Sequence, residues 1–464
     1  MKKVIVLGAG FSGLSVAWQI GLSRQYDVAV YEKSQSIGGL CGYYDFKGLK
    51  LDYGPHKIYS VIPGVMDEFR RLGGDRLKEI NKRHKIILRG KLLDYPVKLG
   101  QVLSIFTFSE IFTVGGSVLA ILITSSFLKK DVSYEGYCIS IFGKKIYSIV
   151  FKPLAEKIWG DPKNLSADIA KKRIPTKSIS DLVLRLLKIK KESKITNAEL
   201  ILYPYRGFYD ICEAMAGEIE RLKHAIHIGV KPVRFIIENN KIERIIFSNN
   251  KEESCDLVVS SIPLDELVGL LFPQDKSFIK ENFVKMRHSV IVYLLISKPR
   301  VLNDHWIFCA DKELLFSRIS EEKLLSDFGF PKDKTVICCD FTCDEEDSIW
   351  KGPDQTIQEK CISGLEKLKI IKKSDVIDSC VVRIPSFYST HMIGYEAKVK
   401  SLFDKINHIQ NIICTGRLGL SDYYNVDHCL DMSIFIAEAL KRGEEPFRIN
   451  YELIRRSEFY HIVD

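Results

Sequence analysis

The residues whose types and spacing could do chemistry begin with a glycine-rich turn near the N-terminus. Gly8, Gly10 and Gly13 form the pattern G-x-G-x-x-G between the apolar run 4–7 and the helical pattern 12–22. The first glycine allows a tight turn, the second lets backbone N–H groups approach a pyrophosphate, and the third lets a helix pack closely on a strand. The N-terminus of that helix also stabilises negative charge. The pattern therefore predicts a dinucleotide-binding turn.

The next strand and the turn after it indicate which dinucleotide is bound. Glu32 lies nineteen residues beyond Gly13, at the end of a second apolar run, where its carboxylate would accept the hydroxyl groups of a ribose. Lys33 follows, and Gly38 and Gly39 form a second glycine turn. This E-K-x-x-x-x-G-G stretch resembles the extended fingerprint of the amine-oxidase and protoporphyrinogen-oxidase flavoproteins. The resemblance implies that the cofactor is FAD, with the added glycines letting the chain pass close to its flavin end.

The composition is that of an ordinary globular protein. The chain has 464 residues, of which 46% are hydrophobic, with 68 Lys and Arg against 59 Asp and Glu. The net charge of +9 is spread over short clusters such as 171–173 and 188–191, which favours a solvated basic surface over attraction to an anionic ligand or membrane face. The sequence has no nucleic-acid-binding pattern, so we expect a small-molecule substrate and no nucleic-acid partner.

The twelve cysteines could belong to disulfides or to a metal site. The sequence contains no C-x-x-C pair, and Cys338, Cys339 and Cys343 lack a second pair of ligands at metal-site spacing. We therefore expect buried, reduced thiols and no metal. Residues 1–3 lead directly into a strand and a glycine turn without an apolar signal segment, which predicts a cytoplasmic protein.

One apolar segment, residues 102–128, could contact a membrane. It carries a single charge, Glu110, and its length meets the usual criterion for a spanning helix. Gly115 and Gly116 near its middle, its many Ser and Thr residues and the expected cytoplasmic FAD unit argue against a span. We expect a buried or interfacial helical pair. The alternatives are peripheral contact with one membrane face and, least favoured, a spanning helix.

Further motifs follow along the chain. Residues 53–56 read Y-G-P-H, residues 157–160 read K-I-W-G, and residues 173–175 read R-I-P. These stretches resemble segments of the UDP-galactopyranose mutases and their oxidase-like relatives from surface-polysaccharide pathways. The resemblance implies that His56 lies against the flavin ring and that Trp159 belongs to the catalytic site.

The second half of the chain continues the same order of motifs. Arg318 lies in a stretch that resembles the mutase motif P-Y-T-R-I-x-E. Arg417 begins a stretch, continuing through Tyr423 and Asp427, that resembles G-R-L-G followed by Y-x-x-M-D. The resemblance implies that Arg318 clamps a substrate diphosphate and that Tyr423 reaches the same group. It also implies that Arg417 lies beside the flavin and that Asp427 starts a helix aimed at the cofactor.

The chain departs from the mutase pattern at several positions. Lys177 stands where the mutases have the second arginine of R-I-P-V-R, which keeps the charge but loses the bidentate fork. Leu154 and Lys188 stand where tyrosines are expected. These differences leave the identity of the sugar open, and Lys177 stays a catalytic candidate. Further candidates are Arg206, Arg287 and Tyr395 for the substrate and Val233 for FAD.

The resemblance implies an FAD-dependent mutase, an isomerase of nucleotide-sugar or surface-polysaccharide metabolism. Reduced FAD would act through N5 as a nucleophile in exchanging the pyranose and furanose forms of a nucleotide-diphosphate sugar, with NAD(P)H as an external reductant. The alternative is an FAD-dependent oxidoreductase of the protoporphyrinogen-oxidase or amine-oxidase kind. It would take a hydride from an apolar or lipid-linked substrate, which the apolar segment 102–128 favours. A non-enzymatic membrane scaffold is the least favoured interpretation.

The order of the elements predicts an α/β protein with a Rossmann-type FAD-binding domain, an inserted helical region and a mostly antiparallel substrate sheet. Strands are expected within 228–262 and at 289–296, with Asn239 and Asn240 as a hairpin turn, and a helix at 427–442. We expect the FAD-binding domain to gather residues 1–75, 200–270 and 405–445. The helical region is expected at 90–195 and the sheet domain at 275–400.

Overall fold

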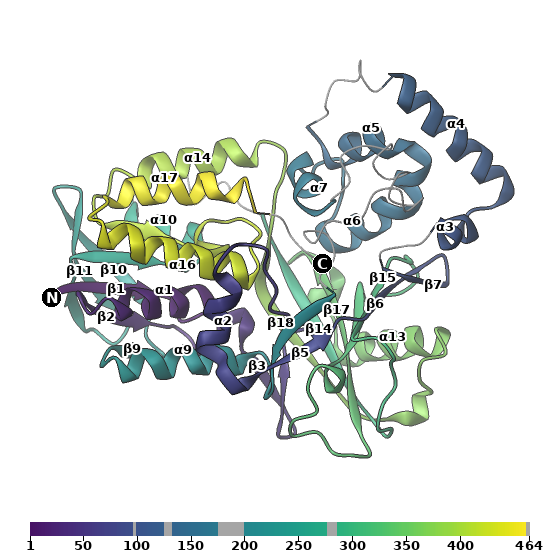
Figure 1. Ribbon diagram of the computed structural model, residues 1–464, viewed down its shortest axis with the longest axis horizontal. Helices are drawn as coiled ribbons and strands as arrows, with labels where there is room; N and C mark the ends of the chain where they lie inside the picture. Colours follow the sequence, from purple (N-terminus) through teal and green to yellow (C-terminus); the bar gives the residue numbers. More distant parts are fainter. Residues whose placement is uncertain (96–98, 125–131, 175–198, 276–284, 461–464) are drawn as a thin grey trace.

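The computed structural model describes residues 1–95, 99–124, 132–174, 199–275 and 285–460 (Figure 1). Figure 1 shows three parts: a sheet with helices packed on it, a second sheet beside it, and a group of helices above the second sheet. The predicted fold class is confirmed, because the chain combines a parallel Rossmann-like sheet with a large, mostly antiparallel one. Lys177 lies outside the described residues.

The Rossmann-like sheet has five parallel strands in the order β19-β13-β1-β2-β9. These are β1 (Lys2–Leu7), β2 (Tyr26–Tyr31), β9 (Ala225–His227), β13 (Leu257–Ser260) and β19 (Ile412–Cys414). Val4 lies opposite Val28 on one side and Leu257 on the other, and all three side chains are buried. Short apolar runs of this kind form strands that are covered on both faces by helices.

Helices pack against this sheet. The helix after the glycine turn, α1 (Phe11–Leu22), contacts α9 (Tyr209–Arg221) on one side and α16 (Val426–Lys441) on the other. The expected C-terminal helix at 427–442 is thereby confirmed within one residue. The remaining helices of this part are α2 (Val65–Gly73), α10 (Leu264–Leu271), α14 (Tyr395–Ile406), α15 (Gly416–Gly419) and α17 (Pro446–Ser457).

The expected strands within 228–262 are confirmed. β10 (Pro232–Glu238) and β11 (Lys241–Phe247) form a hairpin, which β12 (Glu252–Ser254) extends to three strands. Asn239 and Asn240 connect the hairpin with φ angles of 50° and 61°. Two positive φ angles in a two-residue loop match the right-handed twist of the flanking strands, and asparagine tolerates them better than most residues do.

The second sheet has seven strands in the order β18-β14-β17-β16-β15-β6-β7. Neighbouring strands are antiparallel except β15 and β6, which are parallel. The strands are β6 (His84–Leu88), β7 (Lys91–Asp94), β14 (Lys285–Ile296), β15 (Trp306–Cys309), β16 (Arg318–Glu321), β17 (Thr335–Cys343) and β18 (Val376–Thr390). β14 contains the expected strand 289–296. The side chains of β14 from 290 to 296 point alternately to the two faces of the sheet, and all of them are buried.

The segment expected to be helical begins later than predicted. The expectation started it at about residue 90, but β7 pairs with β6 as an edge hairpin of the second sheet. Arg89 and Gly90 turn the chain with φ angles of 53° and 69°, a two-residue turn that the sequence analysis did not recognise. Two short antiparallel pairs complete the strands: the hairpin of β3 (Tyr43–Phe46) with β4 (Leu49–Asp52), and the pairing of β5 (Leu77–Asn81) with the distant β8 (Leu200–Pro204).

The apolar segment forms a helical pair, as expected, but part of it faces solvent. Helix α4 (Phe108–Thr124) follows α3 (Leu99–Ile105), and Phe108 and Phe112 are 78% and 67% exposed. In Figure 1, α4 lies at the outer edge of the molecule. Among the described residues, no helix is long and apolar enough to cross a membrane. The other helices are α5 (Tyr134–Ile146), α6 (Lys152–Trp159), α7 (Ala167–Arg173), α12 (Ser348–Lys351) and α13 (Asp354–Lys367).

The join between β6 and β15 contains a buried histidine whose titration should affect stability. His305 is 2% exposed, and its Nδ1 accepts a hydrogen bond from the backbone N–H of Arg83 at 3.0 Å. Burial, followed by the nearby Arg83 charge, lowers the pKa of His305 from 6.5 to about 4. Between these two pH values the histidine binds a proton in the unfolded chain but not in the folded protein.

The free energy of unfolding is therefore expected to fall, by about 1–3 kcal/mol, as the pH drops from above 6.5 to about 4. Urea denaturation at several pH values measures this slope. His305→Asn should reduce the slope, and the same substitution at the exposed His408 should leave it unchanged. If the free energy of unfolding depended on pH equally in wild type and His305→Asn, His305 would not be the cause of that dependence.

Candidate active site

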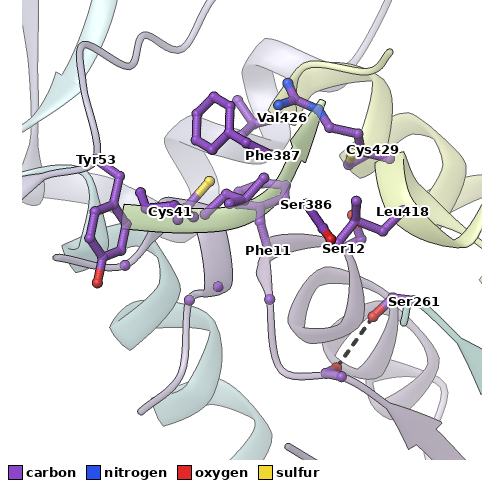
Figure 2. Close-up of a pocket in the computed structure, with 18 of the residues that line it drawn as sticks. Phe11, Ser12, Cys41, Tyr53, Ser261, Ser386, Phe387, Leu418, Val426 and Cys429 are labelled. Atoms are coloured by element: carbon purple, nitrogen blue, oxygen red, sulfur yellow. Dashed lines mark hydrogen bonds between the residues drawn. The ribbon is translucent and has the colours of Figure 1, made fainter. Parts of the chain in front are cut away.

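A cavity of about 680 Å³ runs from the glycine turn after β1 to the end of β18 (Figure 2). Figure 2 shows Phe11 and Ser12 at the start of α1, with Cys41 and Phe387 around the same space. The structure brings most of the sequence-predicted residues to this cavity. They are Gly8, Gly10, Glu32, Lys33, Gly38, Gly39, His56, Arg318, Arg417, Tyr423 and Asp427.

The glycine turn packs as its spacing predicts. Gly8 has a φ angle of +96°, and a Cβ atom on Gly13 would lie 1.8 Å from the carbonyl oxygen of Gly8. Helix α1 therefore begins in direct contact with the turn that ends β1. Gly10 pairs with Gly38 in a parallel bridge, and a Cβ atom on Gly39 would lie 3.1 Å from the Cα of Gly10. The two glycine turns thus lie against each other.

Glu32 is held at the edge of the cavity by backbone hydrogen bonds. One carboxylate oxygen accepts the N–H of Ala9 at 2.8 Å, and the other accepts the N–H of Ser34 at 2.8 Å. Each carboxylate oxygen has a second lone pair, so the group can still accept hydroxyl groups of a ribose. Lys33 lies beside it in an exposed ion pair with Glu266 at 3.3 Å.

Two helices begin at the cavity. Residues of the first turn of α1 line one end, and Asn425, Val426 and Asp427 at the start of α16 line another part. The first turn of a helix presents backbone N–H groups without intrahelical partners and carries partial positive charge. The geometry therefore fits an extended dinucleotide whose electron-rich groups approach both helix ends.

Val233 does not line this cavity. It lies at an irregularity in the pairing of β10 with β11 and is 45% exposed, while its neighbours Lys231 and Pro232 line the cavity instead. An extra residue in one strand of a pair turns the following side chains, which a sequence pattern of period two does not reveal.

Arg318 supplies a positive charge inside the site. It starts β16, and its Nε donates to the Asp340 carboxylate on β17 at 2.8 Å. Burial works against the charged form, but the Asp340 carboxylate outweighs it and raises the pKa of Arg318. A Cβ atom on Gly54 would lie 3.1 Å from Nη2 of Arg318. The Y-G-P-H turn, in which Gly54 has a φ angle of +80°, thus passes directly over the guanidinium.

Arg417 and two tyrosines form the facing wall. The Arg417 guanidinium donates twice to the carbonyl oxygen of Tyr424, at 2.9 and 2.7 Å. It lies 4.6 Å from the ring of Tyr423, which stacks on the ring of Tyr388 at 5.2 Å. Tyr388 was not predicted, because a tyrosine within a long strand reads as ordinary packing.

Trp159 does not contact the cavity directly, but an arginine lies between it and Tyr423. The Arg173 guanidinium lies 4.5 Å from the ring of Trp159 and 4.1 Å from the ring of Tyr423. Trp159 itself is buried in the packing of the helical group and does not line the cavity. The sequence indicates Arg173 only as part of a basic cluster and of an R-I-P motif, and its contact with Tyr423 depends on α7 lying beside residues 422–423.

His56 lies in a buried acid–base cluster at the floor of the cavity. Its Nδ1 is 2.9 Å from the carbonyl oxygen of Gly54, and its ring is 4.9 Å from that of Phe208. Burial alone would lower the pKa of His56, but Cys41 and Asp52 raise it above the usual value. Asp52 is itself held by the N–H of Phe208 at 2.9 Å, and burial raises its pKa to about 6.

Three substrate candidates lie away from the cavity. Arg206 is within 3.5 Å of two carboxylates on α9, Arg287 pairs with Asp344 at 2.9 Å, and Tyr395 stacks on His391 at 4.1 Å. The two arginines are used in ion pairs, and none of the three side chains lines the cavity, so their substrate roles stay predictions. Among the described residues, no group of three or more His, Cys, Asp or Glu side chains is placed to hold a metal ion.

Comparison with known proteins agrees with this geometry. Residues 6–72 match the model of the NAD(P)-binding Rossmann-like domain. A probable UDP-galactopyranose mutase from Klebsiella pneumoniae is 26% identical over 38% of this chain and 46% of its own length. A dTDP-fucopyranose mutase from Escherichia coli is 25% identical over 38% of this chain and 47% of its own. The matched part thus spans about half the length of these curated relatives.

Solved structures match over nearly the whole chain. A reduced UDP-galactopyranose mutase superimposes with a TM-score of 0.80, at 17% identity, over 97% of both chains. A structure named as a protoporphyrinogen oxidase from Exiguobacterium sp. 255-15 gives a TM-score of 0.75, at 15% identity, over 96% of this chain and 99% of the other. The chain therefore contains a Rossmann-like domain and has the fold of the solved UDP-galactopyranose mutase and protoporphyrinogen oxidase structures.

Proposed function

We propose that the protein binds FAD and acts as a mutase on a nucleotide-diphosphate sugar, exchanging its pyranose and furanose forms. The observation that supports this most directly is the cationic end of the cavity. Arg318 and Arg417, on different parts of the fold, lie there with the hydroxyl-bearing rings of Tyr388 and Tyr423. A leaving diphosphate needs cations and hydroxyl donors at fixed positions.

FAD would occupy the remaining part of the cavity. The whole cavity, of about 680 Å³, is within the usual range for cofactor and ligand sites. Glu32 would accept the ribose hydroxyls, the α1 N-terminus would bind the pyrophosphate, and the α16 N-terminus would stabilise negative charge on the flavin. When bound in its reduced form, FAD supplies the nucleophile for the anomeric carbon.

The protein's own residues would bind and orient the sugar nucleotide. Arg318, fixed by Asp340, presents its remaining N–H groups to the diphosphate, and the Tyr423 hydroxyl binds the same group. Arg173 holds the Tyr423 ring from the helical side. His56, at the cavity floor, is placed to bind the flavin side of the reacting centre. Lys177, outside the described residues, remains a candidate for a further cation.

The test offers nucleotide sugars to the FAD-loaded protein with and without dithionite or NAD(P)H. Chromatography of the products should show furanose and pyranose forms interconverting only when the flavin is reduced, with no net oxidation. Borohydride trapping should link the sugar to the flavin, which mass spectrometry would detect. Steady oxygen consumption with a substrate, unaffected by Arg318→Ala, would contradict the proposal.

Arg173→Ala should weaken turnover through the Tyr423 ring. Loss of a cation over an aromatic ring costs about 0.5–2 kcal/mol, or about 2- to 30-fold in kcat/KM. Arg173→Lys should retain part of the rate, because a lysine ammonium can still lie over the ring. Steady-state kinetics with the reduced protein measures both variants, and an unchanged kcat/KM in Arg173→Ala would rule out a role for this contact.

An oxidoreductase acting on an apolar or lipid-linked substrate is the second candidate. The exposed aromatic side chains of Phe108 and Phe112 on the apolar helix α4 favour this candidate, because an apolar substrate binds to apolar surface. This candidate predicts hydride transfer to oxidised flavin and reoxidation by oxygen. Anaerobic bleaching of the flavin by a substrate, without a sugar nucleotide, would support it.

A further inference from the structure

Two thiols lie together at the wall of the cavity. Cys41 follows the second glycine turn and lines the cavity, and Cys212 is on helix α9. The Cys212 thiol donates a hydrogen bond to the carbonyl oxygen of Cys41, with 4.0 Å between the sulfur and the oxygen, and each thiol shifts the pKa of the other. Both side chains are buried, at 6% and 1% exposure. The chain thus places a thiol pair, rather than a single cysteine, beside the cofactor space.

A base and a cation complete this cluster. The Nδ1 atom of His56 faces the carbonyl oxygen of Gly54, which can only accept a hydrogen bond, so Nδ1 carries the hydrogen. The Nε2 atom is therefore the one left to face the Cys41 thiol, which raises the pKa of His56. The Arg417 charge also acts on Cys41. Histidine beside a thiol is the usual arrangement that produces a thiolate.

The titration of the two thiols agrees with this geometry. The hydrogen bond from Cys212 is the largest influence, and with His56 and Arg417 it lowers the pKa of Cys41 to about 5 against the effect of burial. The pKa of Cys212 is raised by the same hydrogen bond and by burial. Cys429, which lines the same cavity, has its pKa raised to about 11 by burial. The pKa of Cys41 is thus shifted in the opposite direction from that of Cys429, a buried cysteine that lines the same cavity.

We propose that Cys41 and Cys212 form a dithiol that exchanges two electrons with the flavin and so holds it reduced; this rests on the FAD binding of the proposed function. An S–S bond forms between the Cys41 thiolate and the Cys212 sulfur, and the S–H bond of Cys212 breaks. The two electrons and that proton pass to oxidised FAD, which becomes the singly protonated, anionic dihydroflavin. The charges and atoms balance without another reactant.

Burial makes the flavin the natural partner of this pair. Soluble oxidants and reductants reach a thiol only when it is exposed, and the two sulfurs are nearly covered by protein. The cavity, which Cys41 lines, is the opening through which electrons can enter or leave. Dithiol and flavin would then share one pool of four electrons.

Anaerobic dithionite titration of the air-oxidised, FAD-loaded protein tests the proposal by counting electrons. Wild type should take up four electrons per FAD, two for the disulfide and two for the flavin. Cys41→Ser and Cys212→Ser should take up two. Cys429→Ser is the matched control, because its thiol lines the same cavity, and it should still take up four.

Peptide mapping of the oxidised wild type provides a measurement that does not depend on any variant folding. It should show a peptide linked through Cys41 and Cys212, and two fewer free thiols than the twelve of the sequence. An uptake of two electrons by wild type, with all twelve thiols free, would overturn the proposal. Neither measurement needs a sugar, so a protein that takes up four electrons but isomerises no nucleotide sugar would refute the mutase function alone.

Discussion

Arg318→Ala is expected to lower kcat/KM for the nucleotide sugar at least about 100-fold while FAD remains bound. The substitution removes the cation proposed to hold the diphosphate, and it also leaves the Asp340 carboxylate without the partner it has at 2.8 Å. Truncating one member of a buried, hydrogen-bonded charge pair typically costs about 2–5 kcal/mol. Steady-state kinetics with the reduced protein measures the loss, and the flavin absorbance reports cofactor content.

Two further variants separate the clamp from general damage. Arg318→Lys keeps a charge but not the planar fork, so its rate should lie between those of wild type and Arg318→Ala. Arg221→Ala removes an exposed arginine that pairs with Glu218 on the same helix, and it should be indistinguishable from wild type. A folded, FAD-containing Arg318→Ala protein with wild-type kcat/KM would contradict the proposed role of Arg318 in binding the diphosphate.

Gly13→Ala is expected to abolish FAD binding and to destabilise the fold by about 3 kcal/mol. The added Cβ atom would lie 1.8 Å from the Gly8 carbonyl oxygen, which belongs to the backbone and has little room to move. Helix α1 would have to separate from the turn after β1, and its N-terminus would leave the pyrophosphate position. Urea denaturation and the ratio of FAD to protein measure the two effects.

Gly217→Ala is the matched control for this prediction. Gly217 lies inside helix α9, and a Cβ atom there would meet nothing within 4 Å. Alanine favours a helix over glycine by about 1 kcal/mol, so this variant should be slightly more stable than wild type and should bind FAD normally. If Gly13→Ala behaved like Gly217→Ala, close packing at the turn would not be the reason for the glycine.

The parts of the fold that local sequence patterns control were predicted well. The glycine turn, the first strands and the Asn239–Asn240 hairpin depend on neighbouring residues, and their patterns indicate them directly. The start of the helical segment was misplaced because a second two-residue turn, at Arg89 and Gly90, has no asparagine or aspartate to mark it. Local patterns identify a turn only when its residues are typical ones.

The parts of the site that depend on distant contacts were predicted less well. Arg287 is a substrate candidate because of its charge, but it pairs with Asp344, which directly follows the adjacent strand β17 and is far away in the sequence. Cys41 and Cys212 meet only because α9 packs beneath the second glycine turn. Tyr388 joins Tyr423 across two segments of the chain. Such pairings follow from the fold, and no short motif contains both partners.

The Rossmann-like sheet and its cavity draw on segments near both ends of the described chain. Glu32 and the glycine turns are synthesised several hundred residues before Arg417 and the start of α16. At roughly 5–20 residues per second, the interval between them is on the order of tens of seconds. During that time the growing chain holds half a cofactor site, so we expect FAD to join the protein only after nearly all of the described chain has been made.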